Sequence, residues 1–527
     1  MGQSNLMALL LNGHGETTVI CTHYSMPLCM SKARTFYPSL ETFKEMALTG
    51  TIIPVYSEIL ADMDTPVSAY KKMGANAYSF LLESIEGGEK WARYSFIGFD
   101  PALIFRSKGK TVQLIKNGSV IRTVESAYPL DVLKELMQEY RPVEVPGLPR
   151  FIGGAVGYLS YDAVRFIERL PCRTADDLHL DDAVFMITET ILIFDTLGNT
   201  IKIVCNAHVD QKASAEKVYA RAKGKIEKII ARLRKPTAPA NSESYGIEPV
   251  SVSSNMEPGA FMSIVSKAKE YIAAGEVIQV VLSQRFQARL DGDSFNLYRA
   301  IRRINPSPYM YYLTLDDLII VGASPEVLVR VEGTQIELRP IAGTRPRGKT
   351  EDEDAFYVKD LLNDPKEIAE HVMLVDLGRN DVGRVSTMGS VVVPEFLTIE
   401  KYSHVMHIVS DVRGTLQSGK NSFDVLKACF PAGTVSGAPK VRAMEIIEEL
   451  EPSARGPYAG AVGYFSFSGN MDFCIVIRTL LITNGSVYFQ AGAGIVADSQ
   501  PENELRETIN KARAMVKALQ MVKEGIE

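Results

Sequence analysis

Two pairs of glutamates, each with its members three positions apart, are the first candidates for chemistry in this sequence. They are Glu367 with Glu370, shortly after Pro365, and Glu504 with Glu507, shortly after Pro501. Proline is common in the first turn of a helix, and residues three apart lie about 60° from each other around it, so each pair should project from one face. Carboxylates from two helices could converge on Mg²⁺, which takes oxygen ligands. Solvated pairs that stabilise the helix dipole are the alternative, and the spacing by itself favours it.

His404 and His407 are the second candidates. In a helix both would face the same way, whereas in a strand they would face opposite ways and at most one could line a site. The sequence contains no His/Cys cluster with the spacing of a zinc site. Its six cysteines lie far apart, without a C-x-x-C pattern, which suits the reduced thiols of a cytoplasmic protein.

Residues 343–350 (GTRPRGKT) match the phosphate-loop pattern G-x-x-x-x-G-K-[ST]. A phosphate cradle uses consecutive backbone N–H groups, and Pro346 lacks one. The acidic residues 351–354 follow, where a triphosphate would lie. We interpret the segment as a basic loop before an acidic helix start, with nucleotide binding as the competing hypothesis.

The elements that must position these residues indicate an α+β protein. Runs rich in β-branched and aromatic residues predict strands, and Asn484-Gly485 between two of them is a strong hairpin signal. Three predicted strands are long and uninterrupted, at 183–194, 311–322 and 473–483. Clustered strands with tight hairpins predict antiparallel β-sheets packed as a sandwich core with flanking helices.

A stretch rich in Pro, Ser and Asn at 236–256 lacks apolar periodicity and divides the chain. We expect a leader of unknown role at 1–36, an N-terminal regulatory and packing region at 37–235, this linker, and a catalytic region at 257–527.

The sequence GAVGY occurs twice, at 154–158 and at 460–464. Five matching residues do not establish a duplication. Chance or a shared strand-packing solution explains them equally well.

Charge and hydropathy exclude two classes of partner. A net charge of −6 over 527 residues argues against a general nucleic-acid binder, which needs a basic face. No apolar run approaches the roughly 20 residues of a membrane helix, and the N-terminus has no signal-peptide pattern. We therefore expect a cytoplasmic protein without a nucleic-acid or membrane partner.

Several long strings resemble the chorismate-utilising enzymes, and most closely component I of anthranilate synthase. Four of them are at 340–348, 370–381, 430–440 and 491–496. The resemblance extends from about Tyr37 to the C-terminus. It implies a Mg²⁺-dependent enzyme that converts chorismate and ammonia to anthranilate and pyruvate, and it places the catalytic region at 257–527 in the chorismate-binding role.

The same resemblance implies roles for individual residues. Glu370 and Glu507 would bind Mg²⁺ most directly, and Glu367 and Glu504 would support them. The implied substrate-binding residues are Gly343, Thr344, Tyr458, Arg478, Gly492, Ala493, Gly494 and Lys511. The implied catalytic residues are Glu326, as the acid that assists loss of the C4 hydroxyl, His407, for pyruvate elimination, Thr344 and Gln279.

Two positions separate the related activities. Gln279 stands where relatives that add water carry a lysine, and a neutral amide cannot act as a base. Ala342 stands where aminodeoxychorismate synthases carry a lysine proposed as a nucleophile. Gln279 and Ala342 therefore both favour direct attack of ammonia on chorismate. The alternative function is that of aminodeoxychorismate synthase component I.

Two further strings resemble the tryptophan feedback site of anthranilate synthases. Their residues are Glu83, Ser84, Asn305, Pro308, Tyr309 and Met310, and ordinary packing between regions is the alternative. The chain lacks a glutaminase nucleophile segment, so the implied partner is a glutamine amidotransferase subunit, anthranilate synthase component II, with L-tryptophan as effector.

Overall fold

The computed structural model describes residues 8–11, 17–20, 34–74, 76–85, 93–209, 214–236, 244–402 and 405–526. The chain divides into two compact units, Met1–Thr35 and Phe36–Glu527. In the first unit, β1 (Ala8–Leu11) and β2 (Thr17–Ile20) form an antiparallel pair. His404 lies outside the described residues. Within those residues, no helix is long and apolar enough to span a membrane.

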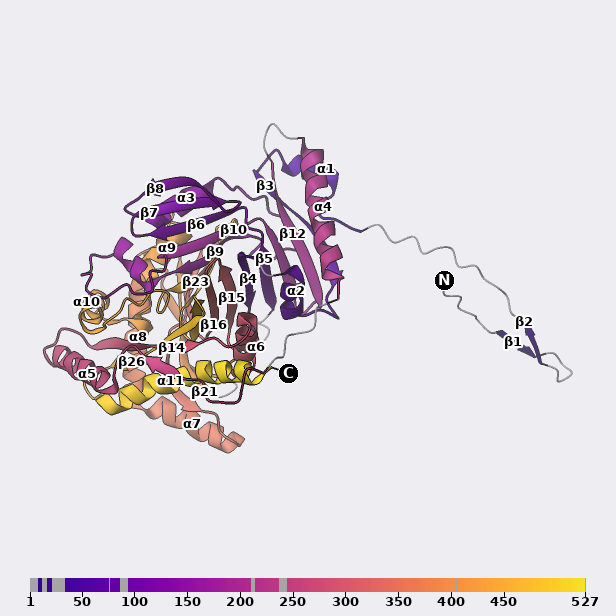
Figure 1. The fold of residues 1–527 in the computed structure, drawn as a ribbon. Coiled ribbons are helices and arrows are strands. Elements are labelled where there is room, and N and C mark those ends of the chain that lie inside the picture. The colour runs from indigo at the N-terminus through magenta and orange to yellow at the C-terminus, as the bar shows by residue number, and fades with distance from the viewer. Residues whose placement is uncertain are drawn as a thin grey trace. The chain divides into compact units, whose positions relative to one another are not determined.

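The second unit is built on two twelve-stranded antiparallel sheets, named here sheet I and sheet II (Figure 1). A core lies between the sheets, where Phe80 and Tyr311 of sheet I meet Tyr158 of sheet II. Each sheet has one further core, which lies between that sheet and the helices on its outer face. The predicted α+β fold, a sandwich of antiparallel sheets with flanking helices, is therefore confirmed.

Sheet I has the order β13-β14-β26-β25-β16-β15-β4-β5-β11-β12-β3, and β22 pairs with β14. Its strands are β3 (Ile52–Leu60), β4 (Tyr78–Glu83), β5 (Tyr94–Phe99), β11 (Thr190–Asp195), β12 (Thr200–His208), β13 (Val252–Ser254), β14 (Gln279–Arg289), β15 (Tyr309–Leu315), β16 (Leu318–Ser324), β22 (Gly437–Ala438), β25 (Thr479–Thr483) and β26 (Ser486–Ile495).

Sheet II has the order β19-β21-β18-β17-β24-β23-β9-β10-β6-β7-β8, and β20 pairs with β21. Its strands are β6 (Leu103–Lys108), β7 (Thr111–Lys116), β8 (Ser119–Glu125), β9 (Gly154–Leu159), β10 (Ala183–Thr188), β17 (Val327–Glu332), β18 (Gln335–Leu338), β19 (Ile341–Pro346), β20 (Val392–Lys401), β21 (Val405–Thr415), β23 (Ala461–Ser466) and β24 (Met471–Ile475).

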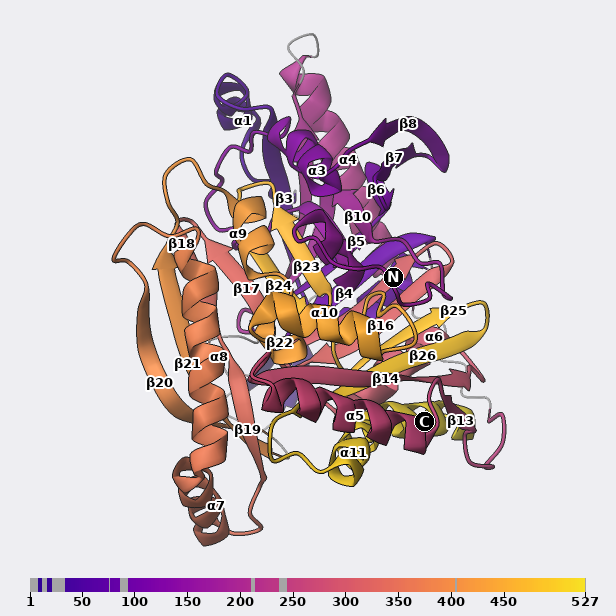
Figure 2. The same ribbon diagram turned by 90° about the vertical axis from the view of Figure 1, so that its left-hand side faces the viewer.

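The helices pack outside the sheets (Figure 2). Those in the core of sheet I are α1 (Leu40–Met46), α2 (Pro66–Met73), α4 (Ala215–Leu233), α6 (Ser294–Ile304) and α11 (Pro501–Glu524). Those in the core of sheet II are α3 (Pro129–Gln138), α8 (Pro365–Gly383), α9 (Ser422–Cys429) and α10 (Lys440–Leu450). The remaining elements are α5 (Pro258–Ala273), α7 (Glu351–Asn363) and the 3₁₀ turns η2 (Tyr161–Phe166) and η3 (Gly433–Val435).

Helix α8 begins where the sequence predicted it. The Asp364 side chain accepts hydrogen bonds from the backbone N–H groups of Lys366 and Glu367, and Pro365 occupies the first turn. Capping of this kind satisfies donors that a helix start otherwise leaves unpaired. The cap therefore fixes the position at which Glu367 and Glu370 leave the helix.

The two halves of the second unit repeat one strand order. From its middle outward, sheet II runs β9-β10-β6-β7-β8 in one direction and β23-β24-β17-β18-β21 in the other. Sheet I runs β4-β5-β11-β12-β3 and β15-β16-β25-β26-β14. Strands in corresponding places follow the same chain order, so the topology is duplicated. We call strands β3–β12 the N-terminal half and strands β14–β26 the C-terminal half.

The repeated GAVGY segments lie at the junction of the halves. They form β9 and β23, which pair with each other so that Gly157 stands opposite Gly463. A Cβ added to Gly157 would lie 1.8 Å from the Val184 carbonyl oxygen, and one added to Gly463 would lie 2.1 Å from that of Asp472. Both glycines are thus required by close backbone approach, which resolves the repeat as a matched packing feature of two duplicated halves.

Three predicted strands proved to be two strands each. The run 183–194 divides into β10 and β11, 311–322 is the hairpin β15–β16, and 473–483 divides into β24 and β25. The breaks are only one to three residues long, at 189, 316–317 and 476–478, and the strands on both sides are buried on both faces, so the apolar pattern resumes at once. Within the predicted linker, β13 pairs with β14.

Candidate active site

One cleft of about 650 Å³ gathers most of the predicted site residues from segments far apart in the sequence. The predicted residues that line it are Gln279, Glu326, Gly343, Thr344, Glu367, Glu370, His407, Tyr458, Arg478, Gly492, Gly494, Glu504, Glu507 and Lys511. Ala493 is the exception, because its side chain is fully buried in a core shared with α5 and α10. All the lining residues belong to the C-terminal half or to the segments inserted into it.

The cleft lies where the chain crosses twice between the sheets. Strand β16 continues into β17 through Pro325 and Glu326, and β24 continues into β25 through residues 476–478. The backbones of the two crossovers are bonded to each other, from Ile475 N–H to the Glu326 carbonyl oxygen (3.1 Å) and from Ala323 N–H to that of Arg478 (3.2 Å). These bonds hold Glu326 and Arg478 in a fixed relation.

Glu326 is almost completely buried. Burial raises the pKa of its carboxyl to about 8, and a hydrogen bond from the Ile341 backbone only partly opposes the shift. Desolvation disfavours the charged carboxylate. Glu326 is therefore protonated at neutral pH and can donate a proton into the cleft.

The two glutamate pairs face the cleft from α8 and α11. Burial raises the pKa values of Glu367 and Glu504, and in each case the charge of the paired glutamate, Glu370 or Glu507, adds to the rise. Among the described residues, no three acidic, His or Cys side chains are already gathered as a metal cluster. The donors are nevertheless the hard oxygens that suit Mg²⁺, which needs only one or two carboxylates beside water and substrate oxygens.

Polar partners orient the carboxylates on α8. The Gln279 side-chain amide donates from Nε2 to Glu370 Oε1 at 2.9 Å, while its own Oε1 has no partner within the protein. Arg345 donates to Glu367 (3.2 Å) and also to Asp364 (2.8 Å). Arg345 was not among the residues predicted from the sequence. Its position within the basic loop 343–350 was the available signal.

His407 lies on β21, paired in register with Thr344 on β19. Its Nδ1 is 3.0 Å from the Gly343 carbonyl oxygen, which can only accept, so Nδ1 carries the proton of the neutral ring and Nε2 is free to accept one. Burial lowers its pKa, and the positive charge of Arg478 adds to that effect. His407 is therefore a neutral base on a strand.

Arg478, Lys511 and Gly492 form the opposite wall. Arg478 donates to the Lys511 carbonyl oxygen (2.8 Å), and Lys511 Nζ lies 2.9 Å from the Gly492 carbonyl oxygen and 2.7 Å from Glu507. A Cβ on Gly492 would lie 2.8 Å from the Tyr458 hydroxyl, so only glycine leaves Tyr458 its place. Lys366 and Asn510 also line the cleft, and no motif in the sequence pointed to either.

The phosphate-loop match is filled by acidic side chains of its own chain. The Gly348 N–H donates to Asp354 Oδ1, and the Lys349 N–H donates to Glu353 Oε2, each at 2.6 Å. Residues of the first part of the motif form strand β19 instead of a loop. The backbone donors that a nucleotide would need are therefore already used.

A second pocket, of about 350 Å³, lies at the junction of the halves and contains five of the six predicted effector residues: Glu83, Ser84, Pro308, Tyr309 and Met310. Asn305 does not line it, because it ends helix α6 and bonds to Ser307. Glu83 is held by Tyr298 and Arg302, whereas the Ser84 hydroxyl has no partner. We call this the junction pocket.

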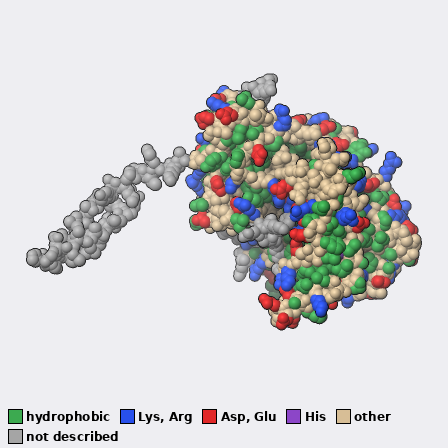
Figure 3. All heavy atoms as spheres, turned by 180° about the vertical axis from the view of Figure 1, so that it is seen from behind, with side chains coloured by type: hydrophobic (Ala, Val, Ile, Leu, Met, Phe, Trp, Pro, Cys, Tyr) green, Lys and Arg blue, Asp and Glu red, His purple; other side chains and the backbone are tan. Residues whose placement is uncertain are grey.

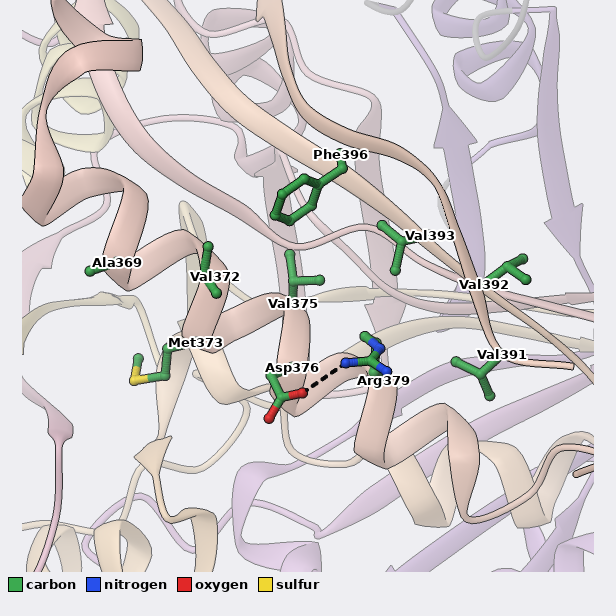
Figure 4. Close-up of a pocket in the computed structure, with 10 residues that line it drawn as sticks. All are labelled: Ala369, Val372, Met373, Val375, Asp376, Arg379, Val391, Val392, Val393 and Phe396. Carbon is green, nitrogen blue, oxygen red and sulfur yellow. Dashed lines mark hydrogen bonds and ion pairs between the residues drawn. The ribbon is translucent and has the colours of Figure 1, made fainter. Parts of the chain in front are cut away.

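An apolar groove of about 830 Å³ lies on the other face of α8, toward β20 (Figure 4). Val372 and Phe396 are 41% and 51% exposed there, and Asp376 and Arg379 form an ion pair at its edge. Elsewhere, on the face shown in Figure 3, acidic and basic side chains are interspersed.

Comparison with known proteins decides the family. Residues 78–517 match the model of the chorismate binding enzyme family. The chain is 51% identical to anthranilate synthase component 1 of Acetivibrio thermocellus over 92% of this chain and 99% of the relative, and 49% identical to that of Aquifex aeolicus over 93% and 99%. The chain belongs to the anthranilate synthase component 1 family of chorismate binding enzymes. The resemblance found in the sequence is thereby confirmed.

The fold comparison agrees with this family. The crystal structure of anthranilate synthase component I from Streptococcus pneumoniae TIGR4 superposes with a TM-score of 0.73 at 37% identity, covering 87% of this chain and 99% of that one. In this component 1 chain, the cleft of the C-terminal half is the candidate active site.

Proposed function

We propose that this chain is the chorismate-converting subunit of an anthranilate synthase. Chorismate and ammonia would give anthranilate, pyruvate and water. The observation that carries the proposal is the single cleft in which a protonated carboxyl (Glu326), a neutral imidazole (His407) and a half-buried guanidinium (Arg478) meet. The carboxyl is protonated and can act as an acid, the imidazole is neutral and can act as a base, and the guanidinium is positively charged and can bind a carboxylate.

In the first step, ammonia forms a C–N bond to the ring as the C4 hydroxyl leaves. Glu326 donates its proton to that oxygen, so that water departs rather than hydroxide. The buried carboxyl, with a pKa of about 8, holds that proton at neutral pH. Gln279 lies in the cleft with a free amide oxygen that can accept an N–H of ammonia.

In the second step, pyruvate leaves and the ring becomes aromatic. The C–O bond between the ring and the enolpyruvyl group breaks as the ring loses a proton to His407 Nε2, the nitrogen left unprotonated by the Nδ1 bond to Gly343. That proton then passes to the departing enolate, which becomes pyruvate and leaves the imidazole neutral again. Arg478 suits a substrate carboxylate because a planar guanidinium donates two parallel hydrogen bonds. The Gly343 and Gly492 backbones border the same space.

Mg²⁺ fits the cleft by donor chemistry, with Glu370 and Glu507 as the direct ligands and Glu367 and Glu504 in support. When bound, the ion would neutralise the carboxylates and hold the substrate's ring carboxylate. The pKa increases at Glu367 and Glu504, to which their glutamate neighbours contribute, support a cation here. Removing Mg²⁺ with a chelator should abolish turnover, and adding it back should restore turnover.

Regulation and supply of ammonia belong to the same proposal. The junction pocket would take L-tryptophan as a feedback effector, supported by its aromatic lining and the unpartnered Ser84 hydroxyl. A glutamine amidotransferase subunit, component II, would deliver ammonia. Substituting Ser84→Ala should weaken tryptophan inhibition while leaving uninhibited turnover unchanged.

Product identity tests the proposed function. Purified chain with chorismate, Mg²⁺ and an ammonium salt at alkaline pH should release fluorescent anthranilate and pyruvate. Aminodeoxychorismate without pyruvate would point instead to an aminodeoxychorismate synthase, and isochorismate would point to addition of water.

A further inference from the structure

Arg455 is a buried cation directly behind the cleft. It is 2% exposed and does not line the cleft itself. Its guanidinium forms a two-pronged pair with Glu451, from Nε to Oε2 at 2.9 Å and from Nη2 to Oε1 at 2.6 Å. Buried ion pairs contribute little net stability compared with apolar side chains of the same volume. Its other contacts therefore indicate what the pair does.

The remaining donors of Arg455 bind two walls of the cleft. Nη1 donates to the Val435 carbonyl oxygen and Nη2 to the Val281 carbonyl oxygen, each at 2.7 Å. Val281 on β14 and Val435 in η3 both line the cleft. Only a rigid fork of several N–H groups can reach a carboxylate and two separate carbonyls at once, and a lysine ammonium cannot.

Arg455 also contacts the ring of Tyr458, whose centroid lies 5.6 Å from the guanidinium carbon. A cation at this distance attracts an aromatic ring, more strongly when both are buried. Tyr458 is buried and lines the cleft beside Gly492. The position of the ring therefore depends on the cation behind it.

Glu451 extends the same network to strands β14 and β26, which border the cleft. Its Oε1 accepts from the Ser283 backbone N–H (2.8 Å) and hydroxyl (2.7 Å). Gln490, which lines the cleft, donates to the same hydroxyl at 2.8 Å. One ion pair thus connects β14, β26, η3 and Tyr458.

We propose that Arg455 and Glu451 are positioning residues that hold Tyr458 and the walls at Val281 and Val435 in the arrangement that binds chorismate. The inference rests on the proposed function only for the identity of the substrate. Neither residue touches the reacting atoms, so the effect should fall on substrate affinity more than on turnover.

The test is calorimetric binding of chorismate in the presence of Mg²⁺ and without ammonia, combined with steady-state kinetics. The Arg455→Lys substitution keeps the charge and loses the fork. Its Kd and KM for chorismate should rise about tenfold, while kcat falls less than about threefold. Because binding is read without turnover, a failure of the proposed reaction would appear in the wild-type product and not in this comparison.

The matched control is the ion pair of Arg165 with Glu448, at 2.6 Å, because Glu448 lies near the end of α10, three residues before Glu451. Neither residue lines the cleft. Arg165→Lys should lower the Tm without changing the Kd for chorismate. If both lysine variants lose only thermal stability, the pair is structural and the proposal fails. If Arg455→Lys does not fold, Glu451→Gln decides, because an unchanged Kd in that variant would overturn the proposal.

Discussion

The two halves of this protein share one topology but differ in what has been added to it. In the N-terminal half, β7 and β8 are joined by Asn117-Gly118, two residues with positive φ as a tight hairpin requires. In the C-terminal half, the corresponding strands β18 and β21 are separated by residues 339–404. This insertion contains β19, α7, α8 and β20, and so supplies Gly343, Glu367 and Glu370.

The crossovers between the two sheets also differ between the halves. Residues 98–102 (GFDPA) lead from β5 into β6, as residues 322–326 (GASPE) lead from β16 into β17. Ala102 therefore stands where the C-terminal half has Glu326. One residue, Glu189, separates β10 from β11, whereas three residues ending in Arg478 separate β24 from β25. The scaffold is shared, and much of the candidate chemistry comes from an insertion and from exchanges at the crossovers, joined by Glu507 and Lys511 of α11.

The largest effect is expected when the difference between Glu326 and Ala102 is removed, at the crossover from β16 to β17. Glu326→Ala gives the C-terminal half the residue of the N-terminal half and removes the proton donor. We expect kcat to fall about 10³-fold, within the usual range for a general acid. The control is Ala102→Ser at the corresponding position, which should retain wild-type kcat. Equal losses in both variants would indicate damage to the scaffold.

A smaller effect is expected at the strand that follows the insertion. His407→Met removes the acceptor for the ring proton but should leave amination intact. Anthranilate formation should fall about 100-fold while an aminated intermediate that retains the pyruvyl group accumulates, as followed by chromatography. The exposed His179 offers a control, since His179→Met should behave as wild type. Normal anthranilate output from His407→Met would exclude His407 from the elimination.

The pH dependence tests the proton on Glu326. The folded-state pKa is raised to about 8, so the protonated form prevails below that pH and is lost as the pH rises through it. Since the protonated form is the active one, kcat at constant free ammonia should fall up to about tenfold per pH unit above that value. Glu326→Gln should be slow and lack this decline. A flat wild-type profile across the same range would refute the acid role.

The smallest effect is expected at the two matched glycines, where the loss of stability should be equal in the two halves. Gly157→Ala and Gly463→Ala each force a Cβ against a carbonyl oxygen of a neighbouring strand. Each should lower the free energy of unfolding by about 2–3 kcal/mol, measured by denaturant titration. Gly383→Ala on α8, where nothing lies within 4 Å of the added Cβ, should be neutral or slightly stabilising. Clearly unequal losses at Gly157 and Gly463 would weaken the matched-packing account.

The sequence predicted the fold class and the helix starts well because their signals are local. Pro365 with its Asp364 cap, and Asn484-Gly485 between β25 and β26, appear where expected. It failed where strands change sheets, as at residues 476–478, because strands that are buried on both faces lie on either side of a break of only one to three residues. The duplication was equally hidden, since strand order leaves no trace in five matching residues.

The candidate site was predicted by resemblance more than by residue pattern. Spacing alone favoured solvated glutamates, and only the fold places α8 and α11 on one cleft. Arg455 could not be found from the sequence, because the two cleft walls that it binds, at Val281 and Val435, are distant from it in the chain. The burial that raises the pKa of Glu326 is also a property of the assembled sheets.

In the proposed reaction, the C-terminal cleft joins ammonia to chorismate. The most direct test supplies ¹⁵N-labelled ammonium, chorismate and Mg²⁺ to the wild-type chain and to Glu326→Ala, with products identified by mass spectrometry. We predict labelled anthranilate and an equal amount of pyruvate from the wild type, and neither above background from the variant. Unlabelled products from the wild type, or labelled anthranilate at an undiminished rate from the variant, would contradict the account.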